Sequence, residues 1–153
     1  MHSSVVAVDG KAYCFAAESG TGKSTLTRYW KEVLGDRLTV INGDKPIYRF
    51  QGRQLLAYGT PWCGKENWQV NTSAPLKALC LMERGEENAV FPLDAFEVLG
   101  EMLHHFHVPG GSKVDMPRLM ELIDRMVSLV PVYRLRCRND ISAAETAIAY
   151  FDL

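Results

Sequence analysis

The fold of this chain is decided by the stretch Ala16-Ala17-Glu18-Ser19-Gly20-Thr21-Gly22-Lys23-Ser24-Thr25. An apolar run over residues 12–16 leads into it, and a helix-compatible segment over residues 26–34 follows and ends at Gly35. A strand, a glycine-rich turn and a helix in this order are the arrangement that a phosphate-binding loop requires. The sequence therefore predicts that the phosphates of a nucleotide are held by Ser19, Gly20, Thr21, Gly22, Lys23, Ser24 and Thr25.

Each residue type in this loop has a chemical role. Gly20 and Gly22 allow the backbone to curl so that several N–H groups converge on phosphate oxygens. The helix adds its positive N-terminal end, Lys23 adds a mobile charge for the outer phosphates, and the Ser24 hydroxyl reaches a magnesium ion. Ala17 replaces the first glycine of the usual pattern. A glycine-rich turn with an incidental lysine is the alternative, and the strand-to-helix context disfavours it.

Composition and charge restrict the class of protein. A chain of 153 residues is expected to form one domain over residues 1–153, and 47% hydrophobic with 23% charged residues is typical of a soluble globular protein. The net charge of −1 provides no basic field for nucleic acid or an anionic membrane. No apolar run approaches the roughly 20 residues of a membrane span, and the N-terminus lacks a signal-peptide pattern. We therefore expect a cytoplasmic protein with neither nucleic acid nor membrane as a partner.

The four cysteines are scattered along the chain, at positions 14, 63, 80 and 137, and none forms a Cys-x-x-Cys pair. Cys14 and Cys80 lie in apolar runs that are typical of buried strands. This spacing favours reduced thiols in or near the core over disulfides or a zinc site.

Apolar runs and turn signals predict the remaining elements. Asp9-Gly10 and Gln51-Gly52 each indicate a hairpin. Strands are expected at residues 4–8, 11–16, 38–41, 47–50, 54–58, 76–82 and 132–137. Helices are expected over 93–106 with a break at 109–111, from Pro117 onward, and over 143–150 with Ser142 or Asp140 as its cap. Hairpins followed by helices predict an α/β fold, a single-domain mixed β-sheet sandwich with a phosphate-binding loop and flanking helices.

A carboxylate follows the strand predicted at residues 38–41, in the sequence Asn42-Gly43-Asp44. Such a carboxylate beside the loop can hold the metal, as can Ser24, or accept a proton from an attacking hydroxyl. The alternative is a turn-forming Asn-Gly-Asp. Lys65 lies in a glycine-containing loop over residues 59–68, from which it can close over a triphosphate or stay solvated.

Several other side chains have two interpretations. The run 104–107, His-His-Phe-His, invites a metal site, but adjacent histidines on a helix diverge, which favours a polar helix end. Trp62 and Trp68 can stack on a base, although ordinary packing is favoured. Glu83, at a strand end, is favoured as a structural residue. Candidate clamps for an anionic substrate are Arg49, Arg53, Arg118 and Arg134, and spacing selects none of them.

The order of these motifs resembles the catalytic domain of HPr kinase/phosphorylase-like proteins. The resemblance rests on residues 2–10 before the loop, on the loop itself, on Gly43-Asp44, and on the segments 59–65, 81–85 and 131–135. The same nucleotide-binding fold occurs in ATP-dependent phosphoenolpyruvate carboxykinase, whose loop has a similar Ser-Gly-Thr-Gly-Lys core. The resemblance spans nearly the whole chain, and only the phosphate-binding loop is specific by itself.

The resemblance implies an ATP- and Mg²⁺-dependent phosphotransferase that acts on a hydroxyl group. It implies that His2, before the first strand, leans on Asp44 as a catalytic pair; the alternative is a solvent-exposed histidine at a frayed terminus. The catalytic set is then Asp44, Lys23, Lys65 and His2, with Ser24 and Asp44 as metal ligands. HPr kinases form rings, so a homo-oligomer is also implied.

Departures from the family leave the acceptor and the activity open. Lys45 stands where HPr kinases usually have a second aspartate, Thr25 stands in place of an acidic residue, and their later glycine-rich signature has no counterpart. The expected acceptor is therefore an unidentified protein or small-molecule hydroxyl. The alternatives are a non-catalytic nucleotide-binding regulatory module, a phosphoenolpyruvate carboxykinase-related protein without the decarboxylation domain, and a catalytic core whose recognition domain is on another protein.

Overall fold

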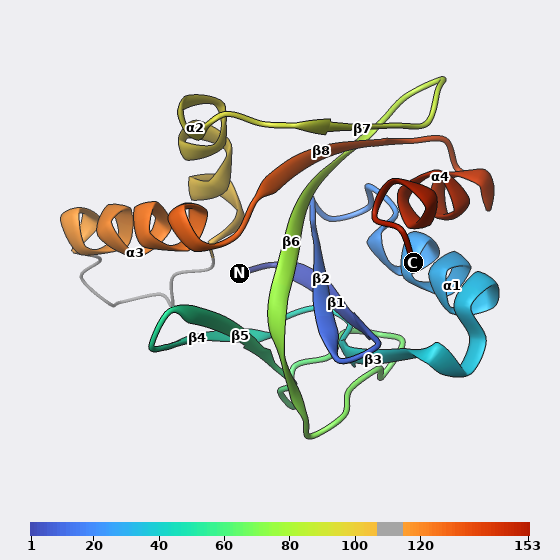
Figure 1. The fold of residues 1–153 in the computed structure, drawn as a ribbon, viewed down its shortest axis with the longest axis horizontal. Coiled ribbons are helices and arrows are strands. Elements are labelled where there is room, and N and C mark those ends of the chain that lie inside the picture. Colours follow the sequence, from blue (N-terminus) through green and yellow to red (C-terminus); the bar gives the residue numbers. More distant parts are fainter. Residues whose placement is uncertain (107–114) are drawn as a thin grey trace.

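The predicted phosphate-binding loop joins a strand to a helix at one edge of a mixed β-sheet (Figure 1). The computed structural model describes residues 1–106 and 115–153. Its strands are β1 (Ser3–Val8), β2 (Lys11–Ala16), β3 (Leu38–Asn42), β4 (Ile47–Gln51), β5 (Gln54–Tyr58), β6 (Ser73–Arg84), β7 (Ala89–Pro92) and β8 (Val132–Cys137). Its helices are α1 (Lys23–Leu34), α2 (Ala95–His105), α3 (Met116–Leu129) and α4 (Ser142–Tyr150), with a 3₁₀ turn at Gly35–Arg37.

Strand direction brings four loops to the same edge of the sheet. The sheet runs β3-β1-β2-β6-β5-β4, and β8 pairs with both β6 and β7. Because β1 is antiparallel to β2 and to β3, these two strands run in the same direction, and β2, β6 and β8 are parallel. The carboxyl ends of β2, β3, β6 and β8 therefore lie together, which is where open α/β sheets bind ligands.

The sheet has a hydrophobic core on each face. Alternate side chains of a strand point to opposite faces, so Val5 and Cys14 pack in one core while Val6 and Tyr13 pack in the other. Helices α2 and α3 cover the first face, and α1 and α4 cover the second (Figure 1). On α1 the buried side chains recur every four residues, at Leu26, Trp30 and Leu34. The predicted sandwich of helices around a mixed sheet is confirmed.

Both hairpins predicted from turn residues are present in the structure. Asp9 (φ 48°) and Gly10 (φ 79°) connect Val8 to Lys11 across the β1–β2 pair, and the β4–β5 hairpin turns at Gly52 (φ 59°). In the first hairpin, positive φ at both Asp9 and Gly10 matches the twist of the flanking strands. The N-cap of α4 is Ile141, without a capping side chain, so the predicted caps Ser142 and Asp140 are wrong; Asp140, one residue earlier, accepts a hydrogen bond from the Ser142 N–H (3.0 Å).

Other boundaries differ from the sequence prediction. β6 begins at Ser73 because residues Ser73–Pro75 pair with β5, a long-range contact that local hydrophobicity does not report. β7 was not predicted, since its four residues are ordered only by pairing with β8. Helix α1 begins at Lys23, inside the loop motif. The predicted break at residues 109–111 lies outside the described residues. No helix in the described segments has the length and apolar character needed to cross a membrane.

Candidate functional site

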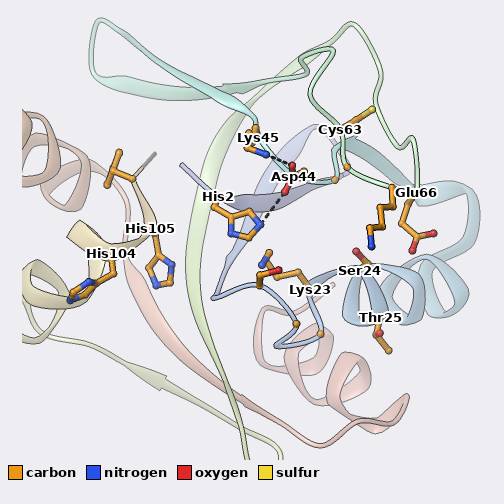
Figure 2. Close-up of a pocket in the computed structure, with 17 residues that line it drawn as sticks. His2, Lys23, Ser24, Thr25, Asp44, Lys45, Cys63, Glu66, His104 and His105 are labelled. Carbon is orange, nitrogen blue, oxygen red and sulfur yellow. Dashed lines mark hydrogen bonds and ion pairs between the residues drawn. The ribbon is translucent and has the colours of Figure 1, made fainter. Parts of the chain in front are cut away.

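A cavity of about 880 Å³ opens at the edge where β2 and β3 end (Figure 2). Its volume is within the range of small-molecule sites. Four segments meet around it, namely the N-terminal residues, the phosphate-binding loop, the end of β3 with the loop over residues 59–68, and the end of α2. Its polar lining consists of His2, Ser19, Lys23, Ser24, Thr25, Asp44, Lys45, Lys65, Glu66, His104 and His105.

The phosphate-binding loop has the backbone form that its glycines allow. Gly20 (φ 84°) and Gly22 (φ 118°) are in the left-handed region, and Gly22 immediately precedes α1. The Lys23 ammonium donates hydrogen bonds to the carbonyls of Ala17 (2.8 Å) and Glu18 (3.0 Å). Burial lowers the pKa of Lys23, and the charge of Asp44 partly opposes this. The ammonium is thus held inside the loop by two weak acceptors, which an anion can replace.

Arg84, at the end of β6, supports the same loop. Its guanidinium donates to the carbonyls of Gly20 (2.6 Å) and Thr21 (3.2 Å). Because β6 is parallel to β2, its carboxyl end lies beside the loop that follows β2. Arg84 was not predicted as a site residue, and the available signal was its place two residues after the strand predicted at residues 76–82.

Asp44 faces the phosphate-binding loop across the cavity (Figure 2). The side chain of Asn42 accepts hydrogen bonds from the N–H groups of Asp44 (2.9 Å) and Lys45 (2.8 Å), which fixes the turn after β3. The Asp44 carboxylate contacts His2 Nε2 (3.0 Å) through Oδ1 and Lys45 Nζ (2.6 Å) through Oδ2. Asn42-Gly43-Asp44 therefore forms a turn, and that turn also presents the carboxylate to the cavity.

Burial and the neighbouring lysines together set the electrostatics of this cluster. Burial raises the pKa of Asp44, but the hydrogen bond and charge of Lys45, with the charges of His2 and Lys23, more than offset it and hold the pKa below its ordinary value. Burial lowers the pKa of His2, and the charge of Lys23 adds to this effect while Asp44 opposes it. At neutral pH we therefore expect an ionised Asp44 beside a neutral His2.

The N-terminal segment is fixed by backbone hydrogen bonds. The His2 N–H donates to the His105 carbonyl (2.8 Å), and the Ser3 N–H donates to the Asp44 carbonyl (2.9 Å). His2 is therefore ordered between the end of α2 and the turn after β3, and its side chain points at Asp44 (Figure 2). The structure places His2 and Asp44 together, as the family resemblance implied.

The loop over residues 59–68 forms one wall of the cavity. A Cβ on Gly43 would lie 2.8 Å from the Cys63 carbonyl oxygen, so only glycine allows this close approach. Lys65 and Glu66 both line the cavity, and Glu66 contacts Arg28 of α1 at 3.5 Å. The predicted packing of Trp62 is wrong, since this residue is 62% exposed. Trp68 lies under the Arg28 guanidinium, 6.0 Å from the ring centre.

The end of α2 reaches the cavity, which the sequence analysis did not predict. His104 and His105 occupy the last turn of α2, as expected for a polar helix end, but both also line the cavity. Burial lowers the pKa of His105, and the charge of Lys23 contributes to this shift. His107, the third histidine of the run, lies outside the described residues. The hydrogen bond between the His2 N–H and the His105 carbonyl joins the end of α2 to the site.

The other candidates are placed elsewhere. Glu83 binds Arg136 (2.7 Å) and Arg134 (3.1 Å), and Arg134 also binds Glu101, so Glu83 has the structural surroundings that were favoured. None of the four candidate arginine clamps is among the described residues that line the cavity. All four cysteines are buried free thiols, as expected, and Cys63 lies in the cavity wall.

The cavity offers few protein ligands for a metal ion. Within residues 1–106 and 115–153, no three His, Cys, Asp or Glu side chains are grouped to form a metal site. Ser24 and Asp44, the predicted ligands, do line the same cavity, and both supply oxygen atoms. Mg²⁺ usually takes one or two protein oxygens and completes its shell with phosphates and water. The two side chains fit that pattern when a nucleotide is bound.

Comparison with known proteins shows a similarity in structure but none in sequence. No family model and no curated protein matches the sequence. The chain is similar in structure to the HPr(Ser) kinase/phosphatase from Coxiella burnetii, with a TM-score of 0.53 over 99% of this chain and 95% of that chain. The two chains share a fold. Their sequences are only 13% identical, so the similarity concerns the arrangement of strands and helices.

Proposed function

We propose that this chain is an ATP- and Mg²⁺-dependent phosphotransferase that phosphorylates a hydroxyl group. The observation that supports this most is the position of the Asp44–His2 pair, which faces Lys23 and Ser24 across one cavity. A phosphate-binding loop opposite a carboxylate is the minimum that phosphoryl transfer needs, because positioning and charge neutralisation supply most of the catalysis. The Coxiella burnetii protein of the same fold is a kinase/phosphatase, which supports this class of chemistry.

The residues have separate roles in this proposal. The amides of residues 19–25 and the Lys23 ammonium bind the β- and γ-phosphates, and Lys23 exchanges its two carbonyl partners for phosphate oxygens. Asp44 accepts the proton of the attacking hydroxyl, and His2 orients the carboxylate through its 3.0 Å contact. Lys65 approaches the phosphates from the loop over residues 59–68. Mg²⁺ would be held by the Ser24 hydroxyl and, where Asp44 acts as a ligand instead of a base, by the Asp44 carboxylate, and the ion would neutralise phosphate charge.

Asp44→Asn tests the proposed catalytic role. The amide has the same shape but accepts protons poorly, so we expect phosphate release from ATP to fall about 100-fold or more, in line with the loss of a general base. Affinity for ATP, measured by calorimetry, should change much less. Lys23→Ala is the complementary variant, and its affinity for ATP should fall about tenfold or more because a charged hydrogen bond is lost.

The matched control is Asp124→Asn, an exposed carboxylate on α3 far from the lining residues. It should leave both measurements unchanged. ATP binding by the wild-type protein with neither phosphate release nor transfer to any candidate hydroxyl acceptor would contradict the enzyme and support a binding module. Absence of ATP binding in a folded wild-type protein would contradict both the enzyme and the binding module.

A non-catalytic nucleotide-binding module is the second candidate. The Lys45 ammonium lies 2.6 Å from the Asp44 carboxylate, and this ion pair opposes the use of that carboxylate as a base or metal ligand. The ATP hydrolysis and binding measurements above distinguish the two candidates.

A further inference from the structure

Hydrogen bonds to its N–H and to its carbonyl fix the backbone of Lys45 in the candidate site. Its N–H donates hydrogen bonds to the Asn42 side chain (2.8 Å) and to the Trp62 carbonyl (3.1 Å). Its carbonyl accepts a hydrogen bond from the Thr60 hydroxyl (2.7 Å). Asn42 and Thr60 are themselves buried and hydrogen-bonded to each other (3.1 Å). The buried hydrogen bonds of Asn42 and Thr60 therefore set the direction in which the Lys45 side chain leaves the backbone.

The Asp44 carboxylate is already neutralised by this lysine. Oδ2 accepts a hydrogen bond from Lys45 Nζ (2.6 Å), and Oδ1 contacts His2 Nε2 (3.0 Å), so both oxygens have a donor (Figure 2). The Asp44 side chain is 20% exposed and the Lys45 side chain 43%, so solvent screens the pair mainly from the lysine side. Any cation that approaches Asp44 must compete with the ammonium of the adjacent residue, Lys45.

The cavity also has an excess of positive charge. Lys23, Lys45 and Lys65 line it, against the carboxylates of Asp44 and Glu66. Glu66 is in contact with Arg28, so its charge is partly neutralised from outside the cavity. A triphosphate that enters therefore meets a surface that attracts it before any divalent cation is added.

We propose that Lys45 acts as a built-in counter-ion that allows this cavity to bind nucleoside triphosphate free of divalent cation. The inference rests on the proposed function, because it assumes that the phosphate-binding loop receives a triphosphate. Lys45 neutralises Asp44 and thereby removes the repulsion between this carboxylate and the phosphates. Mg²⁺, which would otherwise be needed for that purpose, becomes dispensable for binding, although not for phosphoryl transfer.

The test is the affinity for ATP, measured by calorimetry with EDTA or with millimolar Mg²⁺. For the wild-type protein we expect the two dissociation constants to agree within about threefold, a difference well under one tenfold step in affinity. Lys45→Met removes the ammonium but keeps a flexible apolar stem. Its affinity in EDTA should fall about tenfold or more, as for the loss of a charged contact, and Mg²⁺ should restore most of it.

Lys45→Arg keeps the charge and should keep binding in EDTA, whereas Lys77→Met, an exposed lysine on β6, should behave as the wild type in both buffers. Binding of Mn²⁺ without nucleotide, followed by electron paramagnetic resonance, gives an independent readout. Lys45→Met should bind Mn²⁺ more tightly than the wild type, because Asp44 is then free of its competitor.

Two results would overturn the inference and leave the proposed function standing. One is a wild-type affinity for ATP that falls tenfold or more in EDTA. The other is a Lys45→Met variant that binds ATP in EDTA as tightly as the wild type. A folded wild-type protein that binds ATP in neither buffer would overturn the proposed function and, with it, this inference.

Discussion

Glycines set how closely the loop over residues 59–68 packs against the end of β3. At Gly59, where β5 passes into the loop, a Cβ would lie 2.0 Å from the Val70 carbonyl oxygen and 2.9 Å from that of Ile41. Both atoms belong to the backbone, so no side chain can move aside to make room. The hydrogen bond from the Gly59 N–H to the Thr72 carbonyl (3.1 Å) fixes the same approach. Gly59 does not line the cavity, but its close packing helps to position the loop that carries Lys65.

Gly59→Ala is therefore expected to destabilise the protein. The backbone must shift to accept the methyl group, and overpacking of this kind lowers the free energy of unfolding by about 1–3 kcal/mol. Gly100→Ala is the matched control, because a Cβ at this position in α2 meets nothing within 4 Å. It should leave stability unchanged or raise it by about 0.5–1 kcal/mol. Urea unfolding measures both, and equal midpoints for Gly59→Ala and the wild type would contradict the prediction.

β6 connects the two halves of the sheet to the site. Its first residues pair with β5, its middle pairs with β2, and its end pairs with β8. At its carboxyl end Arg84 holds the phosphate-binding loop, while Glu83 binds Arg134 and Arg136 of β8. Arg134 in turn binds Glu101 of α2. The loop, the parallel strands and α2 are thus joined through one strand end.

Glu83→Gln should reveal the contribution of this network through its pH dependence. Burial raises the pKa of Glu83, but the hydrogen bonds from Arg136 and Arg134 more than offset it and hold the pKa below the ordinary value of 4.5. Stability gained from a lowered pKa is present above the unfolded pKa and is lost as pH falls through the folded pKa. At pH 7 the variant should therefore be less stable, by up to about 1 kcal/mol for a partly exposed pair.

The difference between this variant and the wild type should disappear in acid, below the folded pKa of Glu83. Thermal unfolding across a pH series measures it. Glu121→Gln, which removes a more exposed contact with Arg118 on α3 (2.8 Å), is the control and should have little effect at any pH. If the stability difference between Glu83→Gln and the wild type stayed constant from neutral to acidic pH, packing rather than charge would explain the lower stability of the variant.

Local signals in the sequence were enough to predict most of the molecule. The hairpin at Asp9-Gly10, the loop around Lys23 and the apolar strands depend on neighbouring residues, so they could be predicted without tertiary contacts. The extension of β6, the strand β7 and the approach of His105 to the cavity depend on pairings between distant segments. The pairing of Asp44 with Lys45 needed atomic positions, because adjacent charged residues often point apart.

Two cores on opposite faces of one sheet should unfold together, because β2 and β6 contribute side chains to both. The cysteines report this, since Cys14 lies in one core and Cys80 in the other, and burial raises the pKa of Cys14 to about 11. In pulsed thiol labelling at rising urea, read by mass spectrometry, we expect Cys14 and Cys80 to become reactive at the same concentration. Cys63, which is 6% exposed in a surface loop, should react earlier by local opening. Separate midpoints for Cys14 and Cys80 would show that the two helical layers open independently.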